Sequence, residues 1–348
     1  MKVVDTRVLP MGGHIPTAQN AQRRWDERRG FLLELVDDQG RVGQGEASPL
    51  PGYSDEALDD VFAALGTLRP VAYIESLADV AAVIAAMDGA YPSARFATET
   101  ALLDLLSRTL GKSIEHCLAP DRLLRNVPLS AVVTDDGSAR RALEAGAAAL
   151  KIKVGRDLDG ELAFVARLRG TFGPAFGLRI DANQSLPIAT ANEWLERFGA
   201  FHPEFVEEPV PPEDLAALAP SAVKIALDES LSRPDAPDRV AMLADRGMLG
   251  ALVLKPARLG GVLACLEWAA QGAAVGIPSV ASHMLGGPIE LRACVALALV
   301  LGPNTAHGLW PHAGLIAWPD TRIAAFRSGR LHAEDSPGLG FSRISLRP

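Results

Sequence analysis

The sequence predicts an α/β barrel preceded by a smaller α+β capping domain. The chain has 348 residues, whereas a (β/α) barrel takes roughly 250, so a second, smaller domain is expected. After residue 127, short apolar runs alternate with helical segments, and charged residues stand at the ends of successive runs. We place the capping domain at residues 1–110, completed by the tail from about 323 to 348, and the barrel at residues 111–322.

The first 110 residues contain both strand-like and helical patterns. The strand-like run 30–36 is followed by an Asp-Gln-Gly turn at 38–40, which is typical of an antiparallel meander. Helical periodicity then predicts three helices, at residues 55–68, 77–87 and 94–110.

The rest of the chain shows the spacing of repeated strand-helix units. No eighth strand is apparent, so we expect the barrel to close irregularly, and we expect a strand at 341–345 to return to the N-terminal domain. The predicted barrel strands are residues 129–133, 149–154, 177–180, 205–206, 223–227, 249–254 and 278–281.

Bulk properties narrow the classes of partner. The formal charge of −8 argues against a nucleic-acid footprint and favours a small-molecule substrate. There is no secretory signal and no apolar run of about 18 residues, so we expect a cytoplasmic protein without membrane contact. The three cysteines lack CxxC spacing and are interpreted as reduced core residues. Formation of a homo-oligomer is one possibility that the sequence leaves open.

Three carboxylates follow three successive apolar runs. Asp181, Glu207 and Asp228 would therefore lie together at the carboxyl-terminal rim of a barrel, where active sites are built. Oxygen ligands of this kind favour Mg²⁺, for which Mn²⁺ can substitute. The alternative for any one position is a carboxylate that merely caps the next helix.

Lysines flank these carboxylates in the sequence. Lys151 and Lys153 share one face of a strand, and we expect their mutual repulsion to favour the neutral form that a general base requires. Lys255 is a candidate second acid/base or electrostatic stabiliser, or the partner of an acid. His283 is a candidate base, or a satisfied half-buried histidine.

Taken together, these residues resemble the enolase superfamily, and within it the muconate lactonizing enzyme subgroup. The resemblance implies a modified (β/α)₇β barrel under an α+β cap, with Mg²⁺ on the three carboxylates. It also implies a small-molecule carboxylate substrate. The matching pieces are Lys151-Ile-Lys153, Asp181-Ala-Asn183, Glu207-Glu-Pro209, Asp228-Glu-Ser230 and Lys255-Pro256.

Further residues of these motifs are candidates for contact with substrate or with the metal ligands. The resemblance implies that Glu207 binds the metal and that Glu208 lies behind it. The remaining candidates are Asn183, Glu229, Ser282 and His283.

The segment Gly43-Gln-Gly-Glu-Ala-Ser-Pro-Leu-Pro-Gly-Tyr-Ser54 is similar to one in o-succinylbenzoate synthases. That likeness implies dehydration of a cyclohexadiene carboxylate to 2-succinylbenzoate in menaquinone biosynthesis. Lys153 would move the α-proton, and Lys255 would stabilise the negative charge. N-acylamino acid racemases and dipeptide epimerases share these catalytic residues, but the Asp-x-Asp of the epimerases is missing from residues 308–314. A non-catalytic barrel scaffold is the distant alternative.

Two segments depart from the pattern or lack a settled role. Ser282-His-Met-Leu-Gly-Gly-Pro288 replaces the serine- and glutamate-containing pattern that is usual near the seventh strand of the subgroup. Residues 11–29 carry Arg23, Arg24, Arg28 and Arg29, which could hold a distal substrate carboxylate. We interpret most of these arginines as members of a solvated charged loop.

Overall fold

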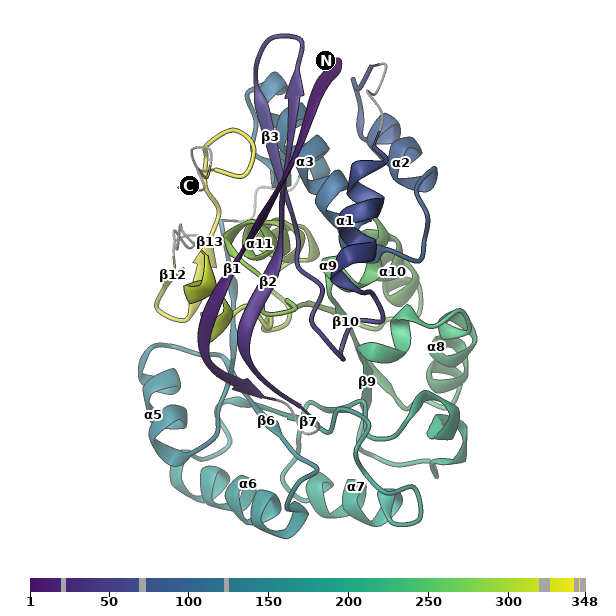
Figure 1. The fold of residues 1–348 in the computed structure, drawn as a ribbon. Coiled ribbons are helices and arrows are strands. Elements are labelled where there is room, and N and C mark those ends of the chain that lie inside the picture. The colour runs from purple at the N-terminus through teal and green to yellow at the C-terminus, as the bar shows by residue number, and fades with distance from the viewer. Residues whose placement is uncertain (20–22, 69–72, 122–124, 319–325, 341–343, 345–348) are drawn as a thin grey trace.

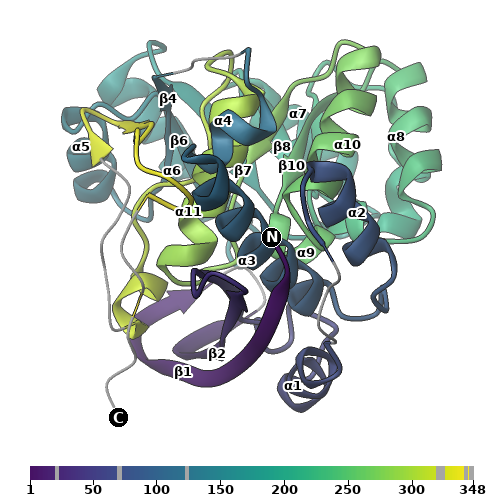
Figure 2. The same ribbon diagram turned by 90° about the horizontal axis from the view of Figure 1, so that it is seen from above.

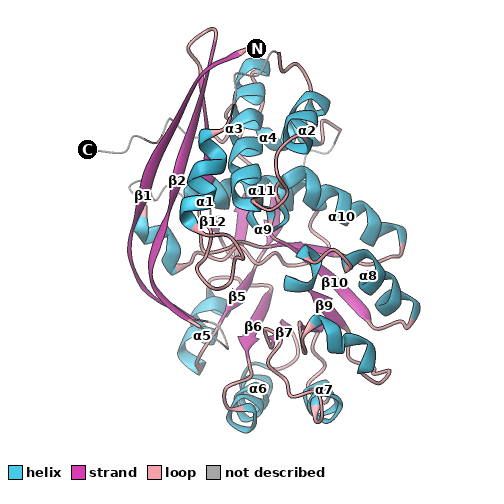
Figure 3. Cartoon of the chain, turned by 45° about the vertical axis from the view of Figure 1, so that its right-hand side comes forward, coloured by secondary structure: helices cyan, strands magenta, loops and turns pink. Residues whose placement is uncertain are grey.

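The computed structural model describes residues 1–348 except for 20–22, 69–72, 122–124, 319–325, 341–343 and 345–348 (Figure 1). Within the described residues, every helix is too short or too polar to cross a membrane. A parallel sheet ringed by helices forms the larger part of the molecule, and a long antiparallel hairpin runs along one side of it (Figure 3). The predicted fold class is thereby confirmed.

The larger part contains a seven-stranded parallel sheet in the order β11-β10-β9-β8-β7-β6-β5. Each predicted run overlaps one of these strands, although four strands are shorter than predicted and β7 and β8 each extend one residue further. The strands are β5 (Ser130–Val132), β6 (Ala149–Lys153), β7 (Gly177–Asp181), β8 (Phe205–Glu207), β9 (Ile225–Leu227), β10 (Leu249–Leu254) and β11 (Ser279–Ala281).

Helices follow these strands and cover the outside of the sheet (Figure 2). They are α5 (Asp136–Glu144), α6 (Leu158–Phe172), α7 (Ala191–Gly199), α8 (Ala236–Asp245), α10 (Val262–Ala274) and α11 (Pro288–Leu301). Short helical turns fill the loops at the strand ends: η1 (Pro212–Ala217), η2 (Glu229–Ser232), α9 (Pro256–Leu259) and η3 (Ala313–Ala317).

Two residues close the barrel where an eighth strand would stand. His307 bridges Leu129 beside β5, and Gly308 bridges Ser282 beside β11, both in parallel. The buried imidazole of His307 accepts from the Ala281 amide at 3.0 Å through Nδ1 and contacts the Gly302 carbonyl at 2.9 Å through Nε2. The expected irregular closing end is therefore confirmed.

Strand register determines which side chains fill the barrel. Arg179 pairs with Lys151 on one side and with Phe205 on the other, so these three share a face. The fully buried Arg179 spans the interior, where its guanidinium donates to the Ala306 carbonyl at 2.6 Å and to Thr305 Oγ1 at 2.8 Å. The layer above Arg179 opens toward the strand ends, where the charged residues lie.

The N-terminal domain is an antiparallel sheet covered by helices. Glycine at position 45 is required by close packing, because a Cβ there would lie 1.8 Å from the carbonyl oxygen of Ala97 on α3. The sheet contains β1 (Val3–Gln19), β2 (Arg24–Asp37) and β3 (Val42–Ala47), and the helices are α1 (Leu58–Gly66), α2 (Leu77–Ala85), α3 (Pro92–Leu110) and α4 (Ile114–Leu118).

Most of these arginines are solvated as expected, because Arg23, Arg24 and Arg29 are exposed, but the described part of residues 11–29 is mostly strand rather than loop. These residues are the end of β1 and the start of β2, and Arg28 is fully buried. Its guanidinium donates to the carbonyls of Leu285 at 2.8 Å and Ser48 at 2.7 Å. Arg28 thus ties the N-terminal sheet to the loop after β11, because four inward-facing backbone carbonyls need a donor there.

The C-terminal tail contacts the N-terminal domain at the described positions. The Ile344 amide donates to Gln44 Oε1 at 2.8 Å, and the Leu339 amide donates to Asp104 Oδ1 at 2.8 Å. The predicted strand 341–345 lies largely outside the described residues. A third, small antiparallel sheet has the order β12-β13-β4, with β4 (Asn126–Pro128), β12 (Phe326–Arg327) and β13 (Arg330–His332).

Two buried glutamates of the N-terminal domain hold the first turns of barrel helices. Glu46 on β3 accepts from the amides of Gly287 at 2.5 Å and Glu290 at 3.2 Å, at the start of α11. Glu99 on α3 accepts from the amides of Val262 and Leu263 at the start of α10. Free amides and the helix dipole stabilise a carboxylate at such a place, so these contacts join the two domains.

Glu99 makes the stability of this junction depend on pH. Burial raises the pKa of Glu99 to about 7, against the hydrogen bonds from Val262 and Leu263. The folded chain then holds a proton that the unfolded chain loses near pH 4.3, so the free energy of unfolding falls as pH rises between these values. Glu99→Gln removes the titrating group. We therefore expect the free energy of unfolding of this variant to fall less steeply with pH than that of the wild type, by up to about 1.4 kcal/mol per pH unit.

Denaturant unfolding of both proteins at pH 5, 6, 7 and 8 measures this difference. The exposed Glu213 supplies the matched control, Glu213→Gln, which should keep the wild-type slope. If the free energy of unfolding changed with pH equally in wild type and Glu99→Gln, the raised pKa assigned to Glu99 would be contradicted.

Candidate active site

The order of the strands brings the charged residues to one rim of the barrel. Lys153 ends β6, Asp181 ends β7 and Glu207 ends β8, and the register places the three side by side. Asp228 directly follows β9, and Lys255 directly follows β10. The three carboxylates therefore stand on neighbouring strands with lysines on both flanks, and all three are buried.

Lys151 lies between two of these carboxylates. Its Nζ is 2.9 Å from Asp181 Oδ2 and 2.7 Å from Glu207 Oε1. Burial lowers the pKa of Lys151, but the carboxylates outweigh burial and the net shift is upward. The expectation that both lysines shift toward the neutral form is therefore wrong for Lys151, because its neighbours are acids rather than the second ammonium group.

Lys153 lies in a more open environment than Lys151. Its Nζ donates to Asn183 Oδ1 at 3.1 Å and lies 3.4 Å from Asp181 Oδ2. Its side chain is 29% exposed, compared with 14% for Lys151 and 10% for Lys255. Lys153 is thus the least enclosed of the three amines and the one best placed to reach a substrate carbon.

Lys255 is held from the opposite flank. It forms a very short contact with Asp228 Oδ2 and donates to the Tyr53 hydroxyl at 2.7 Å. Burial lowers the pKa of Lys255, but Asp228 and other acids raise it further, so the net shift is upward and the amine is held charged. A fixed ammonium group suits electrostatic stabilisation of developing negative charge better than proton abstraction.

Tyr53 is a site residue that sequence reasoning did not single out. It reaches the rim from the loop after β3, and its hydroxyl lies 3.2 Å from Asp228 Oδ2. The Lys255 ammonium and the Arg258 guanidinium lie 4.9 and 4.8 Å from the centre of its ring. Its place in the segment 43–54 was the available signal, although only the fold brings that segment to Lys255.

The Glu208 carboxylate holds the backbone that follows β9. Its Oε1 accepts from the amides of Asp228 at 2.7 Å and Ser230 at 2.8 Å, and its Oε2 accepts from Ser230 Oγ at 2.7 Å. Glu208 has a φ of 41°, in the left-handed region that costs energy for a residue with a side chain. These contacts orient the start of η2 and thereby the backbone of Asp228.

Asn183 and Glu229 continue the polar network behind Lys153. Asn183 Nδ2 donates to Glu229 Oε1 at 3.0 Å, while its Oδ1 accepts from Lys153. The amide orientation is thus determined by an acid on one side and an ammonium group on the other. Asn183 also has a positive φ, of 42°. The network fixes the position of the Lys153 amine.

The carboxylates do not cap the following helices. The Asp228 side chain makes no cap hydrogen bond to η2, and Asp181 Oδ1 accepts from the amide of Asn183 at 3.1 Å within the loop. Burial and the charge of Asp181 raise the pKa of Glu207 to about 8. Buried carboxylates this close together repel one another, and a bound cation would offset that repulsion.

The donor chemistry fits Mg²⁺. All three side chains offer hard oxygen atoms, and Asp228 Oδ1 is enclosed without a hydrogen-bond partner among the described residues. As the described side chains stand, no three acidic, histidine or cysteine groups are close enough to hold an ion. Ammonium groups lie against one oxygen of each carboxylate: Lys151 Nζ contacts Asp181 Oδ2 and Glu207 Oε1, and Lys255 Nζ contacts Asp228 Oδ2.

Ser282 and His283 lie where the barrel closes. Ser282 Oγ faces the Gly308 carbonyl at 3.4 Å. His283 Nδ1 accepts from the Leu285 amide at 3.1 Å, and its ring stacks on that of His312 with 3.9 Å between centroids. Burial, His312 and the nearby lysine charges lower the pKa of His283 well below its usual value. His283 is therefore neutral and half-buried, with Nδ1 already held by the Leu285 amide.

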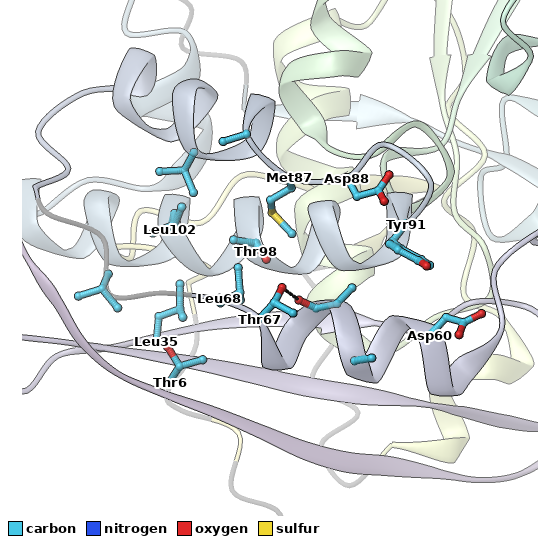
Figure 4. A pocket seen from close by; sticks show the side chains of 15 residues that line it. Thr6, Leu35, Asp60, Thr67, Leu68, Met87, Asp88, Tyr91, Thr98 and Leu102 are labelled. Carbon is cyan, nitrogen blue, oxygen red and sulfur yellow. Dashed lines mark hydrogen bonds between the residues drawn. The ribbon is translucent and has the colours of Figure 1, made fainter.

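A cavity of about 650 Å³ lies away from these residues, inside the N-terminal domain (Figure 4). It is bordered by α1, α2, α3 and the first two strands and is open to solvent on one side, with Leu35, Met87 and Leu102 among its lining. Its described lining includes Asp60 and Asp88 but no lysine, arginine or histidine. No lysine, arginine or histidine accompanies the acids of its described lining, so the barrel rim remains the candidate active site.

Comparison with known proteins agrees with this arrangement. Residues 136–343 match the family of enolase C-terminal domain-like proteins, and residues 10–105 match the MenC N-terminal domain. An o-succinylbenzoate synthase from Thermosynechococcus vestitus is 34% identical over 270 residues, which cover 72% of this chain and 74% of the relative. A chloromuconate cycloisomerase from Delftia acidovorans is 26% identical over 94% of this chain and 93% of its own.

A solved structure is similar along almost the whole length. It is the dipeptide epimerase from Methylococcus capsulatus complexed with Mg and the dipeptide L-Arg-D-Lys, which is 26% identical. The TM-score is 0.84, with 98% of this chain and 99% of that chain covered. With the family match spanning more than half of its residues, this chain belongs to the enolase superfamily, and the charged rim lies in its enolase C-terminal domain-like region.

Proposed function

We propose that the protein is a Mg²⁺-dependent lyase that removes a proton α to a carboxylate and expels a hydroxyl group, as in o-succinylbenzoate synthesis. The main observation in support is the arrangement of charged residues along the rim, with Lys153 and Lys255 on opposite flanks of three buried carboxylates. The match of residues 10–105 to the MenC N-terminal domain supports this choice of reaction. The pathway would then be menaquinone biosynthesis.

Asp181, Glu207 and Asp228 are the residues that would hold Mg²⁺. When bound, the ion supplies positive charge beside the substrate carboxylate and so makes the α-proton more acidic. Arg258 and Tyr53 keep Lys255 in place on the far flank. The Lys255 ammonium then faces the substrate ring, where negative charge accumulates as the proton leaves.

Lys153 carries the proton in this proposal. As a neutral amine it takes the α-proton, and the electron pair of the broken C–H bond forms the new ring double bond as the C–O bond breaks. The departing hydroxide takes the proton back from Lys153, so one water leaves and the amine is restored. Asn183 holds the Lys153 amine at the position from which both transfers are made.

Racemisation or epimerisation is the second candidate, favoured by the 26% identity to the Methylococcus dipeptide epimerase. That reaction needs a neutral base on one face of the α-carbon and a protonated acid on the other, and Lys255 would have to take both roles in the two directions. The Asp228 and Tyr53 contacts that keep Lys255 charged oppose the direction in which it must take a proton, and this favours the lyase.

Side-by-side kinetics tests the two candidates. We expect purified protein with Mg²⁺ to convert the cyclohexadiene carboxylate, followed by ultraviolet absorbance, with a kcat/KM at least about 10² times that for dipeptides or N-succinyl amino acids. The last two are followed by deuterium uptake at the α-carbon in D₂O. Deuterium uptake without dehydration would overturn the lyase proposal in favour of the epimerase.

A further inference from the structure

The cavity between the helices of the N-terminal domain is a feature that the proposed chemistry does not use (Figure 4). Its volume of about 650 Å³ lies within the range of roughly 300–1,000 Å³ that is usual for small-molecule sites. Its described lining includes no residue of the barrel rim. A ligand held there is therefore separate from the reacting substrate.

The sequences of the two flanking helices leave this space open. α1 and α2 each pack on α3, and the cavity is lined by residues of all three. Ala63 and Ala64 line it from α1, and Ala86 lines it from the position that directly follows α2. Methyl side chains are too short to meet across the gap between two helices, so these positions leave it unfilled.

One end of the cavity is apolar. Leu35 on β2 and Leu102 on α3 are buried and line it, and Figure 4 shows Leu68 at the same end. Met87 also lines the cavity, and its unbranched thioether side chain adapts to ligands of different shape. An apolar chain placed here leaves water and gains free energy in proportion to the area that it buries.

The other end of the cavity is acidic. Asp60 on α1 and Asp88 after α2 are exposed at its mouth, and Figure 4 shows them with Tyr91 at the end away from the leucines. Asp60 has no hydrogen bond or ion pair with another described residue, and Asp88 accepts through Oδ1 from the Ala90 amide at 2.9 Å. No described lysine, arginine or histidine of the lining offsets these two charges.

We propose that this cavity binds an amphiphilic cation, a small molecule with an ammonium head and an apolar tail. The head lies beside Asp60 and Asp88, where the ring of Tyr91 also attracts positive charge. The tail lies against Leu35 and Leu102. A carboxylate head on the same tail is repelled by both acids. The inference does not depend on the proposed reaction, because the two sites share no residue.

Calorimetric titration of the protein with n-octylammonium chloride tests the proposal, with Mg²⁺ present to compete for the carboxylates of the barrel rim. We expect one saturable site. n-Octanoate has the same tail with the opposite charge, and n-butylammonium has the same head with a shorter tail. Both should bind at least about tenfold more weakly than n-octylammonium, the first because the acids repel it and the second because it buries less apolar surface.

Variants at the mouth locate the site. Asp60→Asn should weaken n-octylammonium binding about three- to fivefold and leave the affinity for uncharged 1-octanol unchanged. Asp59→Asn is the matched control, because Asp59 is the neighbouring exposed acid of α1 and does not line the cavity. Ala63→Trp places an indole in the cavity from an exposed position and should abolish saturable binding with wild-type circular dichroism.

The absence of a saturable n-octylammonium site would overturn the proposal, and so would n-octanoate binding of equal strength. Equal weakening by Asp60→Asn and Asp59→Asn would mean a general effect of net charge rather than a contact at the mouth. Unchanged binding by folded Ala63→Trp would place the ligand elsewhere on the protein. Either of these results would also overturn the inference.

Discussion

Replacing Lys153 with alanine is expected to lower kcat for dehydration by about 10²–10⁴-fold, the usual contribution of a positioned acid/base group. Lys153 is the most exposed of the three site lysines, and Asn183 holds its amine beside the carboxylate rim. Lys151 cannot take over, since its ammonium lies against Asp181 and Glu207. Stopped-flow absorbance with saturating substrate and Mg²⁺ measures the effect.

A surface lysine provides the control for this experiment. Lys224 is exposed, and its Nζ donates to the Gly247 carbonyl on the side of the barrel away from the rim. We expect Lys224→Ala to keep the wild-type rate. If Lys153→Ala kept more than a tenth of the rate while remaining folded, Lys153 would not be the proton carrier.

Glu207→Gln is expected to weaken Mg²⁺ binding by at least about 10–100-fold, because even partners of metal ligands have effects of that size. The change removes the charge of one of the three proposed oxygen ligands while keeping the shape of this buried side chain. Calorimetric titration with Mg²⁺ measures the affinity directly, independently of turnover.

Glu204 gives a matched control beside the same strand. It directly precedes β8, at the end opposite Glu207, where it pairs with Arg179 at 2.6 Å. Glu204→Gln should leave Mg²⁺ affinity unchanged. Equal Mg²⁺ affinity in Glu207→Gln and wild type would remove Glu207 from the proposed ligand set.

The position of the rim could be read from the sequence because its signals are local. Each of Asp181, Glu207 and Asp228 follows an apolar run, and parallel strands bring their carboxyl ends to one edge. The register then sets Asp181 beside Glu207 without further information. The seven parallel strands were predictable for the same reason, since each alternates with a helical segment.

Features that depend on distant contacts could not be read in this way. Tyr53 reaches Lys255 across 202 positions of sequence, and Arg28 reaches Leu285 across 257. Among the described residues of the closing segment, only His307 and Gly308 bridge their neighbours, which is too short a stretch to show a strand pattern. The protonation of Lys151 was predicted wrongly because it depends on which charges surround the folded side chain, rather than on its spacing from Lys153.

Removal and restoration of the metal tests the central claim most directly. Wild-type protein is treated with a chelator, exchanged into metal-free buffer, and assayed with the cyclohexadiene carboxylate before and after Mg²⁺ is added back. We expect turnover to disappear and then to return with Mg²⁺, while circular dichroism stays unchanged throughout. Full turnover after chelation, or no turnover by folded protein with Mg²⁺ restored, would contradict the account of this rim as a metal-dependent dehydration site.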